Sequence, residues 1–292
     1  MSAFQSMLAP TTERPKSQFW SGNRRLNYLR DALHLSTWIA VGALLQSSLL
    51  FFFSPQWAVL PTLVYLASRI VDTVLIWKGF KPNPEMTNVI TRKVTAQFPG
   101  STTPAEQSLV VIQLAARSNH AVGSFHPYMN AIGKYFERMI DDLEKRSEEF
   151  GYLGSKSYLA NERTTSNEIM VLVYFRTYEG MHKFSHETGG VHREAWEFWN
   201  TVVMGRDSKI GHLFSIMHEA YEIPARHWET IYVNYQPTSM GATTFRVQEK
   251  DGSTKWTNPL VDAHSGPLRT SKGRRATTKG DDNDMYKEAS YR

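Results

Sequence analysis

Histidine side chains are frequent in the second half of this 292-residue chain, and His218 has the most informative neighbours. The pattern of residues 214–222 predicts a β-strand, in which successive side chains point to opposite faces. The apolar residues that this alternation places on the same face as His218 are Phe214, Ile216 and Ala220. Burial among them would lower the pKa of the imidazole and keep it neutral, which suits a general base or an iron ligand. A core histidine bonded only to backbone is the structural alternative.

Other polar and aromatic residues surround this histidine in the sequence. Glu219 lies on the opposite face of the same predicted strand, where it is either a functional carboxylate or an edge charge. His192 begins a predicted helix, and it could ligate, gate a pocket or simply bond to the helix start. The predicted catalytic residues are therefore His218, Glu219 and His192. The predicted substrate-binding residues are Trp196, Tyr221, Tyr232 and Tyr174, although aromatics such as Tyr174 and Tyr232 more often belong to a core.

Composition and motifs exclude several chemistries. The chain contains 0 Cys, which rules out thiolate nucleophiles, zinc–thiolate sites and iron–sulfur clusters. Nucleotide-binding glycine motifs and the G-x-S-x-G nucleophile elbow are absent. His182 and His186 have the spacing of metal ligands on a helix, but no third ligand lies nearby in the sequence, so we predict no metal site.

The elements that position these residues form an α+β pattern. The predicted strands are residues 89–98, 109–115, 153–160, 169–175, 213–223 and 230–234, and the predicted helices begin at Pro127, Tyr178 and His192. After the first strand the order is β-α-β-β-α-β, which predicts a ferredoxin-like split βαβ fold. Strands 109–115 and 169–175 are apolar on both faces, so a partner sheet, a bound ligand or both should cover the side without helices.

A hydrophobic helical hairpin precedes this domain. Residues 35–53 form an uncharged run of about 19 residues, long enough to cross a bilayer. A second apolar run, residues 57–77, follows a three-residue turn, and a signal peptide fits this length and position poorly. Basic residues flank both ends of the hairpin, which predicts both termini in the cytosol. Arg69 and Asp72 lie inside the second run and are expected to pair with each other. Because charges are costly in a bilayer, the alternative is that this segment dips into the membrane without crossing it.

The predicted organisation has five parts. They are a basic segment (1–34), the transmembrane hairpin (35–80), a linker (81–88), the α+β domain (89–237) and a disordered polar tail (238–292). The tail is assigned because hydrophobic periodicity is lost beyond about Thr238. Its basic run, residues 272–275, is interpreted as a solvated charge cluster, with lipid contact or targeting as alternatives. The net charge of +5 is attributed to the membrane-flanking residues and not to nucleic-acid binding.

Three motifs in the second half resemble one known family. They are His192-x3-Trp196-x-Phe198, Gly211-x6-His218-Glu219-x-Tyr221-x-Ile223, and Trp228-Glu229-x-Ile231-Tyr232-x-Asn234. Together they resemble the antibiotic-biosynthesis-monooxygenase-like proteins of the dimeric α/β-barrel superfamily, over about residues 91–245. With its hairpin, the chain is similar to the membrane-anchored fungal secondary-metabolite branch, of the kind found in fumagillin biosynthesis.

The resemblance implies a homodimeric monooxygenase that oxidises an apolar intermediate, such as a terpenoid or polyketide, at the endoplasmic reticulum membrane. It implies either O₂ chemistry without a cofactor or haem, with His218 as the first choice of axial ligand. One alternative is a dehydratase, isomerase or cyclase that uses His218 and Glu219 as acid and base. The other is a non-catalytic membrane adaptor.

Overall fold

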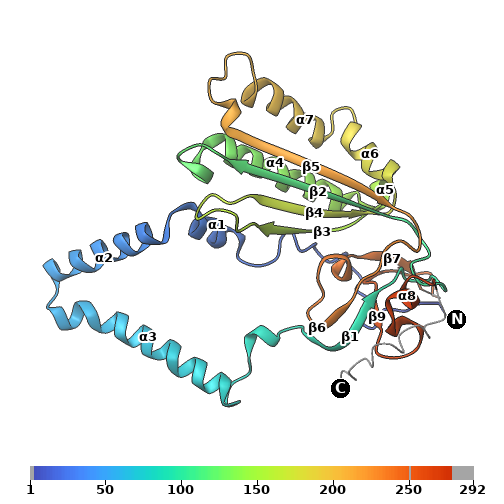
Figure 1. Ribbon diagram of the computed structural model, residues 1–292, viewed down its shortest axis with the longest axis horizontal. Coiled ribbons are helices and arrows are strands. Elements are labelled where there is room, and N and C mark those ends of the chain that lie inside the picture. Colours follow the sequence, from blue (N-terminus) through green and yellow to red (C-terminus); the bar gives the residue numbers. More distant parts are fainter. Residues whose placement is uncertain (1–2, 250, 278–292) are drawn as a thin grey trace. The chain divides into compact units, whose positions relative to one another are not determined.

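The computed structural model describes residues 3–249 and 251–277, and its contacts divide the chain into two compact units. Residues 33–89 form one unit, and the chain before and after them forms the other (Figure 1). The hairpin is therefore an insertion in the sequence of the folded domain and not an appendage that precedes it.

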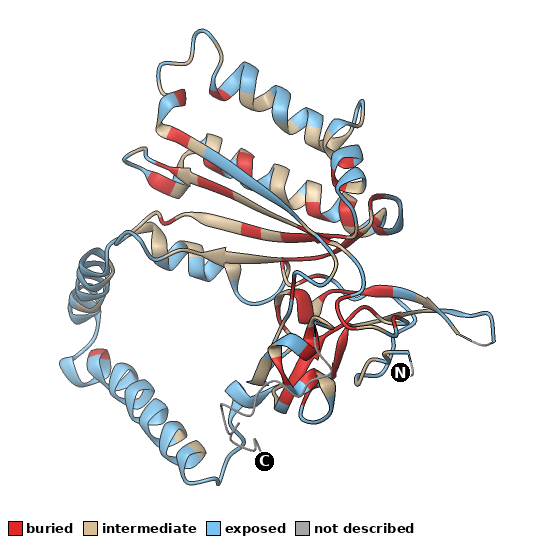
Figure 2. Cartoon of the chain, turned by 45° about the vertical axis from the view of Figure 1, so that its right-hand side comes forward, coloured by how far each residue is buried: buried red, intermediate tan, exposed pale blue. Residues whose placement is uncertain are grey.

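The inserted unit is a pair of apolar helices. Helix α2 (Leu35–Phe52) and helix α3 (Pro55–Trp77) lie close to the predicted bounds, and the short η1 (Pro84–Met86) follows. Both helices are long and apolar enough to cross a membrane, and both are drawn almost entirely as exposed (Figure 2). Near the turn, the Gln46 side-chain amide donates to the Ala58 carbonyl at 2.7 Å, which ties one helix to the other.

The ion pair expected inside the second helix has a different partner. Asp72 pairs with Lys81 and not with Arg69. The reason is the end of α3, where the Lys81 amide bonds back to the Leu75 carbonyl at 3.2 Å. This return brings the Lys81 ammonium back to the carboxylate one turn before the helix ends.

The folded unit contains the predicted split βαβ arrangement. Its elements are β2 (Leu109–Ser118), α4 (Pro127–Lys145), α5 (Ser147–Phe150), β3 (Tyr152–Leu159), β4 (Ile169–Phe175), α6 (Tyr178–His186), α7 (Val191–Phe198), η3 (Trp199–Val203), η4 (Gly211–Leu213) and β5 (Phe214–Ile223). The sheet order is β3-β4-β2-β5, and every neighbouring pair is antiparallel. This order and these directions confirm the ferredoxin-like fold.

Helices α4, α6 and α7 cover one face of this sheet (Figure 1). Helix α4 begins where Pro127 occupies the first turn and the His126 ring nitrogen accepts from the Tyr128 amide at 3.1 Å. Its apolar residues repeat at helical spacing, so Ile140 and Leu143 are buried against the sheet. The chain turns into β3 through Gly151, whose φ of 63° is the left-handed conformation that glycine adopts without strain.

The chain itself covers part of the second face of the sheet. Strands β1 (Ile90–Ala96), β6 (Tyr232–Tyr235) and β9 (Leu260–Asp262) form a small sheet, and β7 (Phe245–Gln248) pairs with β8 (Thr254–Thr257). Side chains from this region, among them Phe98 and Met240, pack on Leu109 and Tyr174 of the main sheet. The two doubly apolar strands are therefore buried on their second face without a partner chain along this part of their length.

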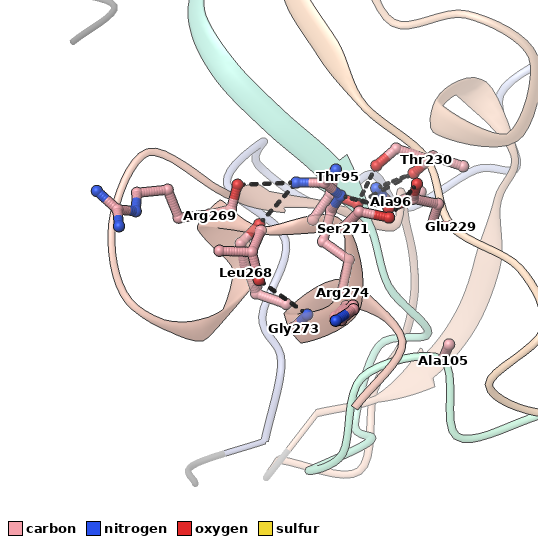
Figure 3. A network of polar contacts seen from close by, with 12 residues as sticks. Thr95, Ala96, Ala105, Glu229, Thr230, Leu268, Arg269, Ser271, Gly273 and Arg274 are labelled. Carbon is pink, nitrogen blue, oxygen red and sulfur yellow. Dashed lines mark hydrogen bonds and ion pairs between the residues drawn. The ribbon is translucent and has the colours of Figure 1, made fainter. Parts of the chain in front are cut away.

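The predicted start of the disordered tail is wrong for residues 238–277. This stretch contains η5 (Ser239–Ala242), β7, β8, β9, η6 (Pro267–Arg269) and α8 (Ser271–Arg274). Arg274, expected in a solvated cluster, is 4% exposed, and its Nε donates to Glu229 Oε2 at 2.9 Å (Figure 3). Residues 278–292, the rest of the predicted tail, lie outside the described residues.

The segment before the hairpin also belongs to the folded unit. The Ser17 amide donates to Glu144 at 2.8 Å, and Gln18 forms a bridge beside Lys156, along the β3 edge of the sheet. Helix α1 (Arg24–Ala32) follows and packs against η2 (Gly123–Phe125). The strand at the other edge of the sheet, β5, is exposed along most of its length (Figure 2).

Candidate active site

A cavity of about 450 Å³ lies between the helix layer and the sheet. Its walls come from α4, α6 and α7 on one side and from β2, β4 and β5 on the other. The apolar lining includes Ile112, Leu114, Ile132, Phe136, Met139, Ile140, Val173, Met181, Phe184, Trp196 and Trp199, and the polar groups are Tyr135, Ser185, His192 and His218. A cavity of this size and composition suits a drug-sized apolar molecule oriented by a few polar contacts.

His192 faces this cavity from the first turn of α7. Its Nδ1 is buried and has no hydrogen-bond partner, which is a costly state for a polar atom. Burial lowers the pKa of His192 below its ordinary value of 6.5, and the nearby His186, His218 and Arg193 charges lower it further, while the Ser185 backbone opposes the shift. The imidazole is therefore neutral at neutral pH, with a nitrogen free to accept a proton.

His218 lines the cavity from the sheet. It pairs with Leu114 of β2, and the strand alternation that places it with Ile216 is as predicted. The predicted burial is wrong, because β5 is the edge strand and His218 is exposed to solvent. Alternation determines which face of a strand carries the side chain, but the position of the strand in the sheet determines how much solvent reaches it.

Trp196 stands at the open side of the cavity. It lines the wall one turn after His192, yet it is 51% exposed. The helix then widens into the π-helical turn η3, whose first residue, Trp199, also lines the cavity. Such turns inside helices are frequent at functional sites. His192, Trp196 and His218 are the predicted site residues that the structure brings together.

Glu219 and Tyr221 lie on the other face of β5, away from the cavity. Their register partners are Gln113 and Val111 of β2. The Tyr221 hydroxyl donates to the Glu219 carboxylate, and this bond raises the pKa of Tyr221. An acid–base pair formed by His218 and Glu219 would need both side chains on one substrate, and their opposite faces prevent this.

Tyr174 and Tyr232 pack with Phe98, Leu109 and Met240 in the apolar cluster on the second face of the sheet, which we call the second core, and they do not line the cavity. Burial raises the pKa of both phenols. The Tyr232 hydroxyl accepts a hydrogen bond from the Gly241 amide at 2.9 Å. Gly241 belongs to the stretch that was predicted to be disordered. Their role is to hold the C-terminal elements against the sheet.

Sequence reasoning did not assign the cavity walls on the helix side. Tyr135, Phe136 and Met139 lie on α4, and Phe184 and Ser185 lie on α6. The available signal was the helical spacing of the apolar residues in α4.

The lining was tested against haem. Haem carries propionate carboxylates, and a carboxylate buried without a cationic or hydrogen-bonding partner is unfavourable. The described residues that line the cavity include no Lys or Arg. Two imidazoles are present, but the walls fit a neutral apolar molecule better than haem.

Comparison with known proteins identifies the family. The family model described as "Monooxygenase af470-like" matches residues 109–240, which contain every wall of the cavity. A protein of Aspergillus fumigatus named Monooxygenase af470 is 31% identical over 280 residues, covering 93% of this chain and 97% of that protein. The chain belongs to the monooxygenase af470-like family. This confirms the resemblance inferred from the three motifs and makes the protein a monooxygenase-type enzyme by family.

Solved structures show slighter likenesses. An aldoxime dehydratase crystallised with butyraldoxime is 13% identical, covers 51% of this chain and 39% of its own, and has a TM-score of 0.38. SnoaB, a cofactor-independent oxygenase from Streptomyces nogalater, is 11% identical over 39% of this chain and 91% of its own, with a TM-score of 0.26. At these TM-scores the fold assignment rests on the strand order of the chain itself and not on these structures.

Proposed function

We propose that this member of the af470-like family oxidises an apolar secondary-metabolite intermediate, a terpenoid or polyketide, inside the cavity and with O₂ as the oxidant. One observation carries the proposal: a largely apolar cavity contains two imidazoles, and the buried Nδ1 of His192 has no partner within the protein. A substrate C–H or O–H group is the partner that this nitrogen lacks.

The reaction begins with proton removal from an activated carbon of the substrate. His192 accepts the proton, and the carbanion left behind gives one electron to O₂. The two radicals combine to form a peroxide, which regains a proton from His192 and loses water to leave a carbonyl. One oxygen atom enters the product, the other leaves as water, and both hydrogens of that water come from the substrate carbon.

The cavity supports each of these steps. Its apolar walls exclude water from the carbanion and the peroxide, which strengthens electrostatic contacts and limits side reactions. His218 lies across the cavity, where it is exposed to solvent, whereas the Nδ1 of His192 is buried. Trp196, at the open side, is placed to hold the substrate in contact with the walls.

The hairpin and the exposed sheet edge complete the proposal. Helices α2 and α3 would anchor the enzyme in the endoplasmic reticulum membrane, with the domain and both termini in the cytosol and the apolar substrate dissolved nearby.

Two copies would associate through the uncovered second face of β5, where Met217 and Tyr221 are 39% and 45% exposed.

Isotope labelling tests the proposed chemistry. The purified chain is incubated under ¹⁸O₂ with a panel of terpenoids and polyketides that carry an activated methylene group, and products are analysed by mass spectrometry. We expect one labelled oxygen in the product and loss of turnover in His192→Gln. An oxygenated product that carries no label, a Soret absorption band that disappears with activity in His218→Ala, or full activity in both His192→Ala and His218→Ala would overturn the mechanism. Pathway output that persists with both alanine variants would favour an adaptor.

A further inference from the structure

Helix α1 has one face bound to the folded domain. The Arg24 guanidinium donates to Glu137 at 3.1 Å, and the Asp31 carboxylate accepts from the Asn167 amide at 2.8 Å. Tyr28 lies between them along the helix and is partly buried, and burial raises its pKa. These residues are spaced four and three apart, so they share one face, which we call the inner face.

The outer face of α1 consists of Arg25, Leu26, Leu29 and Arg30. Leu26 and Leu29 are 57% and 44% exposed and lie one helical turn apart. An arginine flanks this leucine pair on each side of the helix. Exposed leucines bordered by arginines are the composition of a helix that lies in a membrane interface, where long cationic side chains reach the headgroups.

The turn η2 lies beside α1 and carries further exposed apolar residues. Val122 and Phe125 are 48% and 56% exposed on it. A Cβ at Gly123 would stand 2.1 Å from the Ser166 hydroxyl, so η2 is pressed directly against the loop that contains Ser166. The Ser166 amide donates to the Asp31 carbonyl at 3.0 Å. The end of α1 and the turn η2 are therefore held side by side.

Chain connectivity identifies the occupant of this surface. Only residues 33 and 34 separate α1 from α2, so the Cα atoms of Ala32 and Leu35 are at most about 11 Å apart. If α2 enters a bilayer, the end of α1 must lie in the headgroup layer or directly beside it.

We propose that the outer face of α1, together with Val122 and Phe125, binds the surface of a bilayer that contains acidic lipids. This inference rests on the membrane anchoring in the proposed function and adds a second, peripheral contact to it. The contact has a consequence for substrate entry. Turn η2 leads directly into α4, whose Ile132 and Tyr135 line the cavity, so an apolar molecule leaving the bilayer at η2 is close to the cavity wall.

Single-cysteine labelling of the full chain tests the proposal, because the chain has 0 Cys and each introduced thiol is unique. Leu29→Cys reports on the outer face, and Leu44→Cys in α2 reports on the hairpin. Lys145→Cys, at the far end of α4 where the side chain is 71% exposed, is the matched control. Each variant is labelled with an environment-sensitive dye and reconstituted into phosphatidylcholine vesicles with and without phosphatidylserine, and doxyl-labelled lipid is the quencher.

We expect doxyl lipid to quench the dyes at positions 44 and 29 and to leave the dye at position 145 unaffected. Quenching at position 29 should be stronger with phosphatidylserine and should weaken in Arg25→Gln. Quenching at 44 without quenching at 29 would overturn the interfacial role of α1 and leave the anchor intact. Quenching at neither position would overturn both. A dye at 29 that is shielded from aqueous iodide but not quenched by lipid would assign the outer face to a protein partner and overturn the proposal.

Discussion

Arg274 donates from Nε to the Glu229 carboxylate at 2.9 Å and from Nη1 to the Leu268 carbonyl at 3.1 Å (Figure 3). The Arg274 side chain is only 5% exposed, whereas that of Glu229 is 33% exposed. Glu229 precedes β6, and Arg274 ends α8. This pair therefore fastens the last described helix to the sheet that covers the second core.

Replacement of Arg274 should destabilise the folded unit. Arg274→Met removes the cation that donates to the Glu229 carboxylate and to the Leu268 and Arg269 carbonyls. Because Glu229 stays partly solvated, we expect a loss of about 2 kcal/mol in the free energy of unfolding, less than for a fully buried pair. Denaturant titration measures this, with the exposed Arg246→Met as the control. Equal free energies of unfolding for the two variants would contradict the finding that residues 238–277 belong to the folded unit.

Filling the cavity should block binding without unfolding the protein. Ala195 lines the cavity on α7, and Ala195→Phe places a ring in the space proposed for substrate. We expect the affinity for an apolar fluorescent probe to fall at least about tenfold, which corresponds to about 1.4 kcal/mol. Glu197→Phe adds the same ring at an exposed position of the same helix and should bind the probe normally. Unchanged probe binding in Ala195→Phe would place the binding site elsewhere.

Activity should follow the protonation of His192. Only the neutral imidazole accepts a proton, and its pKa is lowered below 6.5, chiefly by burial. We therefore expect kcat/KM to rise with pH at acidic values and to reach its plateau by neutral pH. His192→Gln should lower kcat by roughly 10²- to 10⁴-fold and remove this acidic limb. A limb centred above 6.5 would contradict the assignment.

The same shift has a consequence for stability. The unfolded chain protonates His192 near 6.5, whereas the folded chain protonates it only at lower pH, so the unfolded state binds more protons in between. The contribution of His192 to the free energy of unfolding should be fully present above pH 6.5. It should decline as the pH falls between the pKa of the unfolded chain and that of the folded chain. The decline should be smaller in His192→Gln, as measured by denaturant titration at several pH values. An identical pH dependence in both proteins would show that His192 is not buried as described.

Dimerisation should depend on the second face of β5. We expect the purified protein to be a dimer by light scattering and Met217→Arg to shift it toward monomer, since the exposed Met217 would become a charge in the interface. Glu222→Arg changes the opposite face of the same strand and should remain dimeric. A monomeric wild-type protein, or a dimer unaffected by Met217→Arg, would refute this interface.

Sequence periodicity predicted the central elements well because their burial is strong and regular. Strand β4 has the predicted bounds, and α4 begins at the predicted Pro127. The C-terminal elements were missed because strands of three or four residues carry too little periodicity, and their burial depends on distant partners such as Glu229. Tyr174 was assigned to the site from the sequence, but it packs in the second core. This placement likewise depends on contacts between distant residues that no local sequence pattern encodes.

The two histidines illustrate the same limit within the site. Alternation placed His218 on the correct face, but strand order left it exposed at the sheet edge. His192, ranked below it from the sequence, has the buried and unpartnered nitrogen, because it lies at the start of α7 against Phe184 of α6. Burial at a helix–sheet junction is a property of the assembled layers.

The central claim is that an apolar substrate binds between the helix layer and the sheet, and photolabelling tests it most directly. A terpenoid alcohol bearing a diazirine is irradiated with the full chain, and the modified peptides are identified by mass spectrometry. The account predicts labels on α4 and α7, at residues such as Met139 and Trp196, and their loss in Ala195→Phe. Labels confined to the second core, at residues such as Tyr232, or labels unaffected by Ala195→Phe, would contradict it.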